Sequence, residues 1–251
     1  MVRVALISDI HGNGVALDAV VADFAAREID EIVCLGDIAA GGPQPRAVVG
    51  RVRELGCRAV RGNGESWLLD GLPTGASDET ARLGEAVRWA RERLAPEDLD
   101  YLGALPATLT VSVAGVTVLC CHGSPRSDVE PLLATTSDDA LAQALAGAPA
   151  ACVLAGGHTH LQLLRPCGAR LVVNPGSVGL PLGSLSDDGP LLPAWSEYAL
   201  VEVDDGHVEL AFRRVSVDVD AVATATAAMP HESWAADLER RIRRWNARAA
   251  R

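Results

Sequence analysis

Apolar and polar positions alternate regularly over the first 61 residues of the chain. Apolar runs, typical of buried strands, are separated by segments with apolar residues at helical spacing. In one such segment, Leu17, Val20 and Phe24 share a helix face. The pattern predicts strands over 2–8, 31–35 and 58–61 and helices over 15–24 and 46–55. Because strands and helices alternate, we expect parallel strands joined by crossover helices.

The pattern changes after residue 66, where a helical stretch precedes pairs of short strands. Turn residues such as Ala114-Gly115 and Asp205-Gly206 separate the paired strands. The remaining expected elements are helices over 66–102, 132–145 and 231–250, strands over 108–113, 116–121, 151–154, 170–173, 198–203 and 207–217, and a loop over 183–193. We therefore predict a single α/β domain over residues 1–251, a four-layer α/β/β/α sandwich of two packed mixed sheets flanked by helices. Within it, 66–105 would be a helical insertion and 231–251 a C-terminal helix.

Composition excludes several function classes. The 251 residues include 33 acidic and 22 basic residues, a net charge of −11, which disfavours general nucleic-acid binding. Every basic residue is Arg, so a Walker-type phosphate loop and Schiff-base chemistry, which need Lys, are excluded. No apolar run is long enough to span a bilayer, and we expect no signal peptide. The six cysteines form no Cys-x-x-Cys pair, so we expect reduced cysteines and a cytoplasmic protein.

The candidate chemistry is a set of nitrogen and oxygen donors beside glycines, at the ends of predicted strands. The set consists of Asp9, His11, Asp37, Asn63, His122, His158 and His160. Seven donors are too many for one tetrahedral metal and suit two metals that share a carboxylate. Asp-x-His and His-x-His each place two side chains on one side of an extended segment. A set without thiolate favours Mn, Fe, Zn, Co or Ni over a structural Cys–Zn site.

The order of these motifs resembles the calcineurin-like metallophosphoesterase superfamily. Asp-x-His, Gly-Asp, Gly-Asn, a lone His and Gly-His-x-His occur in sequence over roughly residues 2–180. The strings His-Gly-Ser-Pro-Arg at 122–126 and Asn-Pro-Gly-Ser-Val-Gly at 174–179 resemble its small prokaryotic, phosphodiesterase-like branch. The resemblance implies two divalent transition metals, Mn foremost. One metal would take Asp9, His11, Asp37 and His160, and the other Asp37, Asn63, His122 and His158.

The resemblance also implies an activity, namely hydrolysis of phosphodiester or nucleotide-type phosphate bonds by a hydroxide held on the metals. Asp37, Asn63 and His122 would be the catalytic residues. We expect Arg126, Asn174 and Ser177 to contact the substrate, which would be a small phosphorylated molecule. The alternatives are a dinucleoside polyphosphate hydrolase, a phosphomonoesterase and a catalytically silent binding scaffold of the same fold. No nucleic-acid or membrane partner is expected, and the branch allows a homo-oligomer.

The chain departs from the family pattern in two places. Many members carry His after the Gly-Asn motif, where this chain has Gly64. Without that His, general acid assistance worth about 10²–10⁴-fold in rate would be missing. We therefore expect diesters to be favoured over alkyl monoesters as substrates. We also expect Gly64→His to raise the turnover of substrates with poor leaving groups. We interpret Glu65 as a solvated loop carboxylate. A Gln-Pro-Arg string is replaced by Leu180-Pro181-Leu182, which removes an Arg that could contact substrate.

Overall fold

The first sheet contains the parallel strands predicted at the start of the chain. The computed structural model describes residues 1–72, 78–148, 150–151, 153–183, 185–186, 189–190, 192–229, 240 and 243–244. The sheet has the order β12-β11-β1-β2-β3. Its strands are β1 (Val2–Ile7), β2 (Glu31–Cys34), β3 (Arg58–Ala59), β11 (Trp195–Asp204) and β12 (His207–Ser216). β1, β2 and β3 are parallel, and their crossover helices are α1 (Gly14–Phe24) and α2 (Pro45–Glu54), as predicted.

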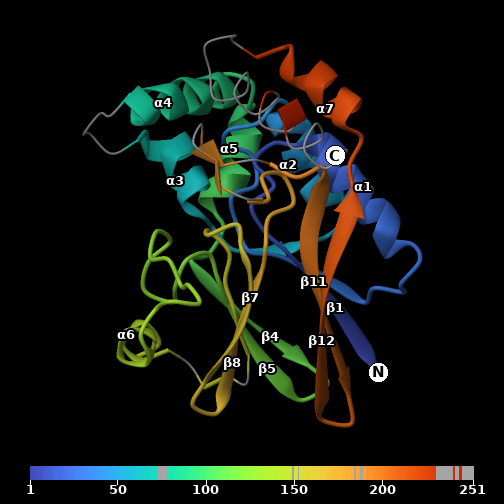
Figure 1. The fold of residues 1–251 in the computed structure, drawn as a ribbon, viewed down its shortest axis with the longest axis vertical. Helices are drawn as coiled ribbons and strands as arrows, with labels where there is room; N and C mark the ends of the chain where they lie inside the picture. The colour runs from blue at the N-terminus through green and yellow to red at the C-terminus, as the bar shows by residue number, and fades with distance from the viewer. Residues whose placement is uncertain are drawn as a thin grey trace.

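The second sheet is also mixed and has the order β4-β5-β6-β8-β7. Its strands are β4 (Thr108–Val113), β5 (Val116–Cys121), β6 (Val153–Ala155), β7 (Gln162–Cys167) and β8 (Arg170–Pro175). β4 and β5 form the predicted hairpin, and β5, β6 and β8 are parallel. Figure 1 shows the two sheets side by side in the lower half of the molecule.

Alternation along the strands explains why the two sheets pack together. In β1, Val4 and Leu6 belong to an apolar cluster shared with Val118 of β5 and Val173 of β8. Their neighbour Ile7 points the opposite way, into a cluster with the helices of the first sheet. Side chains of successive strand residues lie on opposite faces, so one strand supplies both layers. A third cluster joins the outer face of the second sheet to α6 (Asp138–Ala144). The four-layer α/β/β/α prediction is confirmed.

The segment predicted to be mostly helical contains three helices, grouped in the upper half of Figure 1. They are α3 (Asn63–Asp70), α4 (Asp78–Arg91) and α5 (Pro96–Gly103). The pattern did not predict β7 or α7 (Val219–Thr226). The predicted loop over 183–193 includes the two-residue strands β9 (Leu185–Ser186) and β10 (Gly189–Pro190). The predicted helix over 231–250 lies outside the described residues, apart from three positions.

The helix predicted over 132–145 is shorter than expected. Ser137 caps α6, because its hydroxyl accepts a hydrogen bond from the Ala140 amide at 3.2 Å. Before that cap, the Thr136 hydroxyl accepts a bond from the Leu133 amide at 2.9 Å and holds a turn. Side chains that bond to nearby backbone amides favour caps and turns over helix interiors, so the helix begins after Ser137.

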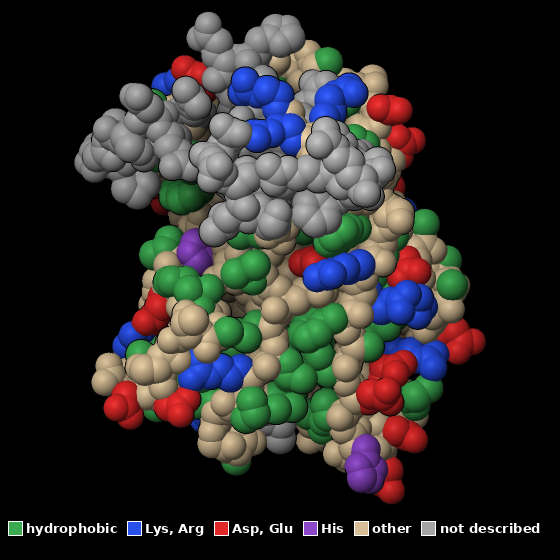
Figure 2. Space-filling model, in the orientation of Figure 1, with side chains coloured by type: hydrophobic (Ala, Val, Ile, Leu, Met, Phe, Trp, Pro, Cys, Tyr) green, Lys and Arg blue, Asp and Glu red, His purple; other side chains and the backbone are tan. Residues whose placement is uncertain are grey.

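Within the described residues, no helix combines the length and apolar character needed to cross a bilayer. The five described cysteines are unpaired. On the face drawn in Figure 2, hydrophobic side chains gather over the lower half, where Figure 1 draws the strands of the second sheet. Leu164, on the edge strand β7, is 47% exposed.

Candidate metal centre

The seven predicted donors lie at the carboxyl ends of strands from both sheets. Parallel strands end at the same edge of a sheet, and loops at that edge are where α/β folds bind ligands. Each donor follows a strand within a few residues. Asp9 and His11 follow β1, Asp37 follows β2, Asn63 begins α3 after β3, His122 follows β5, and His158 and His160 follow β6.

The backbone is strained at most of these positions. Five donors have left-handed φ angles, a conformation that residues with a Cβ rarely adopt. They are Asp9 (54°), His11 (49°), Asp37 (54°), His158 (68°) and His160 (56°). Among the described non-glycine residues, Glu28, Ala114 and Asp205 are the other positions with such angles. Strain of this kind costs on the order of 1 kcal/mol or more per residue and concentrates at functional sites.

Asp9, His11 and His160 form one of two clusters that could hold a metal ion. Asp9 Oδ1 lies 3.2 Å from His160 Nε2 and 3.8 Å from His11 Nε2. The two imidazole Nε2 atoms are 3.1 Å apart. Asp9 Oδ1 is buried and receives no well-aligned hydrogen bond within the described part of the chain. An acceptor left without a donor in this position suits a cation, because a buried unpaired carboxylate oxygen is otherwise costly.

The second cluster consists of Asp9, Asp37 and His122, with Asn63 beside it. His122 Nε2 lies 3.4 Å from Asp37 Oδ1 and 3.0 Å from Asn63 Oδ1. The other oxygen of Asp37, Oδ2, lies 3.6 Å from His11 Nε2. Asp9 thus belongs to both clusters, and Asp37 of the second cluster has one oxygen toward His122 and the other toward His11 of the first. This arrangement fits a shared carboxylate.

His158 stands beside these clusters rather than within either of them. Its ring centroid is 5.3 Å from that of His122, in an edge-to-face arrangement. Its backbone amide donates a hydrogen bond to Asp9 Oδ2 at 3.1 Å. The structure thus brings all seven predicted donors to one place. That His158 is a metal ligand stays a prediction.

Backbone carbonyls hold three of the imidazole rings from behind. The Nδ1 atoms of His11, His122 and His160 lie 2.8, 2.7 and 2.8 Å from the carbonyl oxygens of Ala40, Leu35 and Leu180, respectively. A ring whose Nδ1–H donates to a carbonyl presents the lone pair of Nε2 toward the centre. Contacts of this kind orient the ligands of metal sites and raise their basicity.

The charges of the two aspartates set the pKa values around them. Burial disfavours the imidazolium of His122, but the Asp37 carboxylate beside it prevails and raises the pKa of His122 to about 10. For His160, burial is again outweighed, here by Asp9, and its pKa is raised. Burial lowers the pKa of His11 and that of His158. Nitrogen and oxygen donors that converge in a buried, negatively charged pocket fit divalent transition metals.

Comparison with known proteins agrees with this geometry. The profile of the calcineurin-like phosphoesterase superfamily domain matches residues 2–206. The chain belongs to the calcineurin-like phosphoesterase superfamily. A metallophosphoesterase from Sphaerobacter thermophilus has a similar structure, with a TM-score of 0.71 and 28% identity over 96% of this chain and 97% of that one.

Two further proteins are similar to this member of the superfamily. An uncharacterized protein from Methanocaldococcus jannaschii is 27% identical over 233 residues, which cover 86% of this chain and 88% of the relative. A hypothetical protein from Pyrococcus horikoshii shares the fold, with a TM-score of 0.77 at 20% identity over 95% of this chain and 98% of that one.

Glu65 is buried, which corrects its interpretation as a solvated loop carboxylate. Its side chain is fully inaccessible and accepts hydrogen bonds from the backbone amides of Asp37, Ile38 and Gly62 at 2.8, 2.7 and 2.9 Å. Burial, followed by the charge of Asp37, raises the pKa of Glu65 to about 7. Glu65 is the third residue of α3 and accepts a bond from the amide of the residue before that helix, so a Glu at the third helical position was the sequence signal that could have found it.

Gly64 allows α3 to approach the central carboxylate closely. Its amide donates to Asp37 Oδ1 at 2.6 Å. A Cβ at this position would lie 2.9 Å from that oxygen and 3.1 Å from the Ala40 Cβ. Both contacts are too close for an unstrained side chain. A side chain here would therefore require α3 or the Asp37 carboxylate to shift, quite apart from any general acid that a His would supply.

The three residues expected to contact substrate lie outside the cleft at the metal centre. The Arg126 guanidinium pairs with Glu130, with 2.8 Å between Nε and Oε2. Asn174 is buried; its amide nitrogen donates to the Gly157 carbonyl at 2.6 Å. Ser177 is wholly inaccessible, and its hydroxyl donates to the Asp9 carbonyl at 2.7 Å. Asn174 and Ser177 thus support the loops of the ligands, and a substrate contact by either stays a prediction.

A cleft of about 190 Å³ opens beside the metal centre. Its walls include side chains that the sequence analysis did not single out, above all Trp67 of α3. The lining residues are His11, Asp37, Ala40, Gly41, Asn63, Trp67, Leu83, His158, His160 and Leu180. Trp67 is the fifth residue of a helix whose first residue is the donor Asn63. The spacing of four residues between Asn63 and Trp67, about one helical turn, was the sequence signal that could have placed Trp67 beside the donors.

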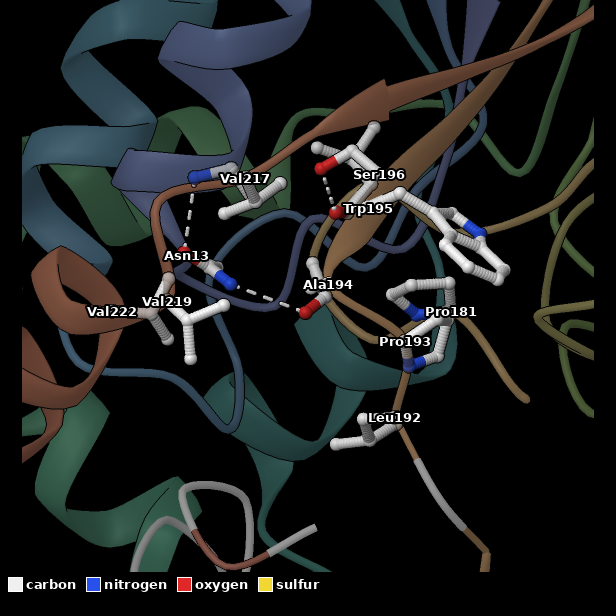
Figure 3. Close-up of a pocket in the computed structure, with 13 residues that line it drawn as sticks. Asn13, Pro181, Leu192, Pro193, Ala194, Trp195, Ser196, Val217, Val219 and Val222 are labelled. Carbon is white, nitrogen blue, oxygen red and sulfur yellow. Dashed lines mark hydrogen bonds between the residues drawn. The ribbon is translucent and has the colours of Figure 1, made fainter. Parts of the chain in front are cut away.

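A second pocket, drawn in Figure 3, lies behind the loop over 178–181. Its volume of about 20 Å³ is room for about one water molecule. Asn13, at the start of α1, donates to the Gly179 carbonyl at 3.2 Å, and Ser196 donates to the Val178 carbonyl at 2.8 Å. These bonds fix the loop that carries the Leu180 carbonyl, so this region supports His160 from behind.

Proposed function

We propose that this protein is a phosphoesterase that uses two divalent metal ions, Mn foremost, to hydrolyse phosphodiester or nucleotide-type phosphate bonds. The observation that carries the proposal is the pair of adjacent clusters, which share Asp9 and between which Asp37 has one oxygen toward His122 and the other toward His11. When bound, two such ions would supply an activated water nucleophile and neutralise charge on the phosphate. Asp9, His11, Asp37 and His160 would hold one ion, and Asp37, Asn63, His122 and His158 the other.

The chain's own residues prepare the site for this chemistry. Carbonyl contacts at Nδ1 fix three imidazoles, and Glu65 fixes the loops of Asp37 and Asn63. Such preorganisation holds the donors within the tolerance that in-line displacement at phosphorus requires. Asp37, Asn63 and His122 are the residues that we place next to the reacting phosphate.

The charge of the cleft supports a diester over a monoester. Among the described residues that line it, none is Arg. A phosphomonoester carries close to two negative charges at neutral pH, whereas a diester carries one. With no cationic side chain in the described lining, the metals alone would balance that charge. A dinucleoside polyphosphate, which carries more charge still, is supported less, and the complete donor set gives no support to a silent scaffold.

Hydrolysis of bis(p-nitrophenyl) phosphate and of p-nitrophenyl phosphate, with added Mn²⁺, tests the proposal. We expect diester turnover to exceed monoester turnover. Asp37→Ala and His158→Ala should each lower activity by more than about 100-fold, because changes even behind the ligands cost about 10–100-fold. Both variants should also bind less metal by elemental analysis. The control is His207→Ala, an exposed histidine at the start of β12.

Each outcome bears on a different part of the proposal. Full activity and unchanged metal content in Asp37→Ala would contradict the metal centre. A preference for the monoester would keep the centre and contradict the diester assignment. Comparison of Mn²⁺ with Fe²⁺, Zn²⁺, Ni²⁺ and Co²⁺ in the same assay tests the choice of metal.

A further inference from the structure

One wall of the cleft is built by the helix that carries a metal donor. Asn63 begins α3, and Trp67 follows it by four residues. Residues four apart lie on the same face of a helix, one turn from each other. Both side chains line the cleft. The helix that places the Asn63 amide at the centre therefore places an indole about one turn away, beside any group attached to a phosphate bound there.

The neighbours of Trp67 in the cleft are apolar. Apart from the donors, the described lining consists of Trp67, Ala40, Gly41, Leu83 of α4 and Leu180, none of which is charged. Leu180 is held in place, because its carbonyl oxygen lies 2.8 Å from His160 Nδ1. The cleft thus combines metal donors with apolar side chains, as expected for a ligand with one charged and one apolar part.

Trp67 also borders open space on a second side. It lines a neighbouring pocket between α3 and α4 together with Leu72, Val87 and Arg88. The side chain is half-buried and packs against the core of the first sheet. Because Trp67 lines both cavities, its ring is not enclosed by protein atoms on every side. Its ring is anchored along part of its surface and open along the rest, as an aromatic binding platform requires.

We infer that Trp67 is a specificity-determining residue that stacks on a planar aromatic substituent of the substrate. This inference rests on the proposed function and names its substrate class, an ester of phosphate that carries an uncharged aromatic ring. The ring is either a nucleobase or a simple aryl group. Aromatic side chains bind both through offset stacking, and outside the donor set the described lining offers no charged side chain for a charged substituent.

The test is calorimetric binding of three phosphate esters to the Mn²⁺-loaded protein. Adenosine 5′-monophosphate carries a purine, phenyl phosphate carries an aryl ring, and ribose 5-phosphate carries neither. Stacking of a base on an aromatic side chain changes affinity by about 5- to 150-fold. We expect at least one ring-bearing ligand to bind more than about 5-fold tighter than ribose 5-phosphate. Tighter binding of the nucleotide identifies a nucleobase, and equal or tighter binding of phenyl phosphate identifies an aryl group.

The variants separate stacking from packing. Trp67→Ala should bring the affinity ratio between ring-bearing and ring-free ligands close to one, and Trp67→Phe should restore most of it. Leu164→Ala, on the exposed edge strand β7, is the control and should keep the whole ratio. A ratio that survives in Trp67→Ala would overturn the inference. So would an equal loss of affinity for all three ligands, which is the mark of a structural role.

Binding and hydrolysis distinguish this inference from the proposed function. Ring-dependent binding without any hydrolysis of bis(p-nitrophenyl) phosphate would contradict the phosphoesterase activity. It would still support stacking of Trp67 on the ring of the ligand. Hydrolysis without ring-dependent binding would contradict the platform and leave the activity standing. Failure of all three ligands to bind the wild-type protein would likewise overturn the platform.

Discussion

The carboxylate of Glu65 accepts a hydrogen bond from the backbone amide of Asp37, with 2.8 Å between the two atoms. The same carboxylate accepts bonds from the amides of Ile38 and Gly62. Gly62 immediately precedes the donor Asn63. One buried side chain thus ties the loop after β2 to the loop after β3, and the spacing between Asp37 and Asn63 depends on it.

Replacement of this carboxylate by an amide should loosen the metal centre. In Glu65→Gln, an NH₂ group faces at least one backbone amide that now lacks an acceptor. We expect a loss of about 1–3 kcal/mol in the free energy of unfolding, measured with urea in the presence of a chelator. We also expect Mn²⁺ affinity, measured by calorimetry, to fall by about 10–100-fold, as for other changes behind metal ligands.

A suitable control for that variant is a buried carboxylate that caps a helix elsewhere. Asp98 is 5% exposed and accepts a hydrogen bond from the Ala95 amide at the start of α5. Asp98→Asn should lower stability by about 0.5–2 kcal/mol without changing Mn²⁺ affinity. If Glu65→Gln behaved in the same way, Glu65 would be a structural cap with no role in positioning the donors.

Gly64 should resist any side chain. Because a Cβ would lie 2.9 Å from Asp37 Oδ1, Gly64→Ala displaces either α3 or the carboxylate. In Gly64→Ala we expect Mn²⁺ affinity and diester turnover to fall by at least about tenfold. Gly64→His should lower both quantities to a similar extent. The geometry thus argues against the expectation, drawn from the family resemblance, that His at this position improves poor leaving groups.

Gly84→Ala is a control that separates the effect of steric crowding at Gly64 from the effect of helix propensity. Beyond the backbone of α4 itself, no atom of the described residues lies within 4 Å of a Cβ built on Gly84, in the interior of that helix. Gly84→Ala should therefore raise stability by up to about 1 kcal/mol and leave turnover unchanged. Higher turnover of alkyl phosphates in Gly64→His would show that α3 can shift to make room for the side chain. It would then support the explanation that His at this position acts as a general acid.

The loop after His122 should lose stability in acid. Glu130 accepts hydrogen bonds from the Arg126 guanidinium and the Ser124 hydroxyl, which lower its pKa from 4.5 to about 2. Between those values the unfolded chain binds more protons at this group than the folded chain, so stability falls as pH decreases from 4.5 toward 2. Because the Arg126 side chain is 54% exposed, solvent screening keeps the contribution below about 1 kcal/mol.

Urea unfolding between pH 3 and 6 measures this contribution. Glu130→Gln should be less stable than the wild type at pH 6, and the difference should narrow toward pH 3. Glu209→Gln, an exposed carboxylate on β12, should show a much smaller pH-dependent difference. A difference for Glu130→Gln that stays constant over this range would mean that the loop is held by packing and not by the charge of Glu130.

The sequence predicted the parts of the molecule that follow from local patterns. Apolar alternation in 2–7 predicts a strand with two buried faces, and that strand lies at the centre of the first sheet. Donors placed directly after parallel strands meet at one edge of their own sheet, and the packing of the two sheets brings the two edges together. The position of all seven donors was therefore accessible without coordinates, whereas their division between two metals came from family resemblance.

The features that the sequence analysis did not predict depend on contacts between segments far apart in the chain. β7 contains Pro166, which disfavours a strand, and it forms as an edge strand paired with β8 alone. The buried state of Glu65 depends on an amide 28 residues away. Likewise, the sequence gives no sign that Ser177 is wholly enclosed, because its hydroxyl bonds to the Asp9 carbonyl 168 residues away.

Asn174 offers a test between a supporting role and contact with substrate. Its amide nitrogen donates to the Gly157 carbonyl and lies 3.1 Å from the Thr159 hydroxyl, on either side of His158. Its oxygen accepts a bond from the Gly176 amide at 2.9 Å. Asn174→Ala removes all three bonds, so we expect a loss of about 1–3 kcal/mol in the free energy of unfolding. Mn²⁺ affinity should fall by about 10-fold or more, because the loop that carries His158 and His160 is released.

The matched control removes the same kind of bond far from the centre. The Asp218 side chain accepts bonds from two backbone amides at the start of α7, and Asp218→Ala should cost about 0.5–2 kcal/mol with Mn²⁺ affinity unchanged. A substrate contact by Asn174 predicts a different result, namely a raised KM at saturating Mn²⁺ with metal affinity and kcat unaltered. Since Asn174 is 4% exposed and its polar atoms already have partners, we expect the loss of metal affinity instead.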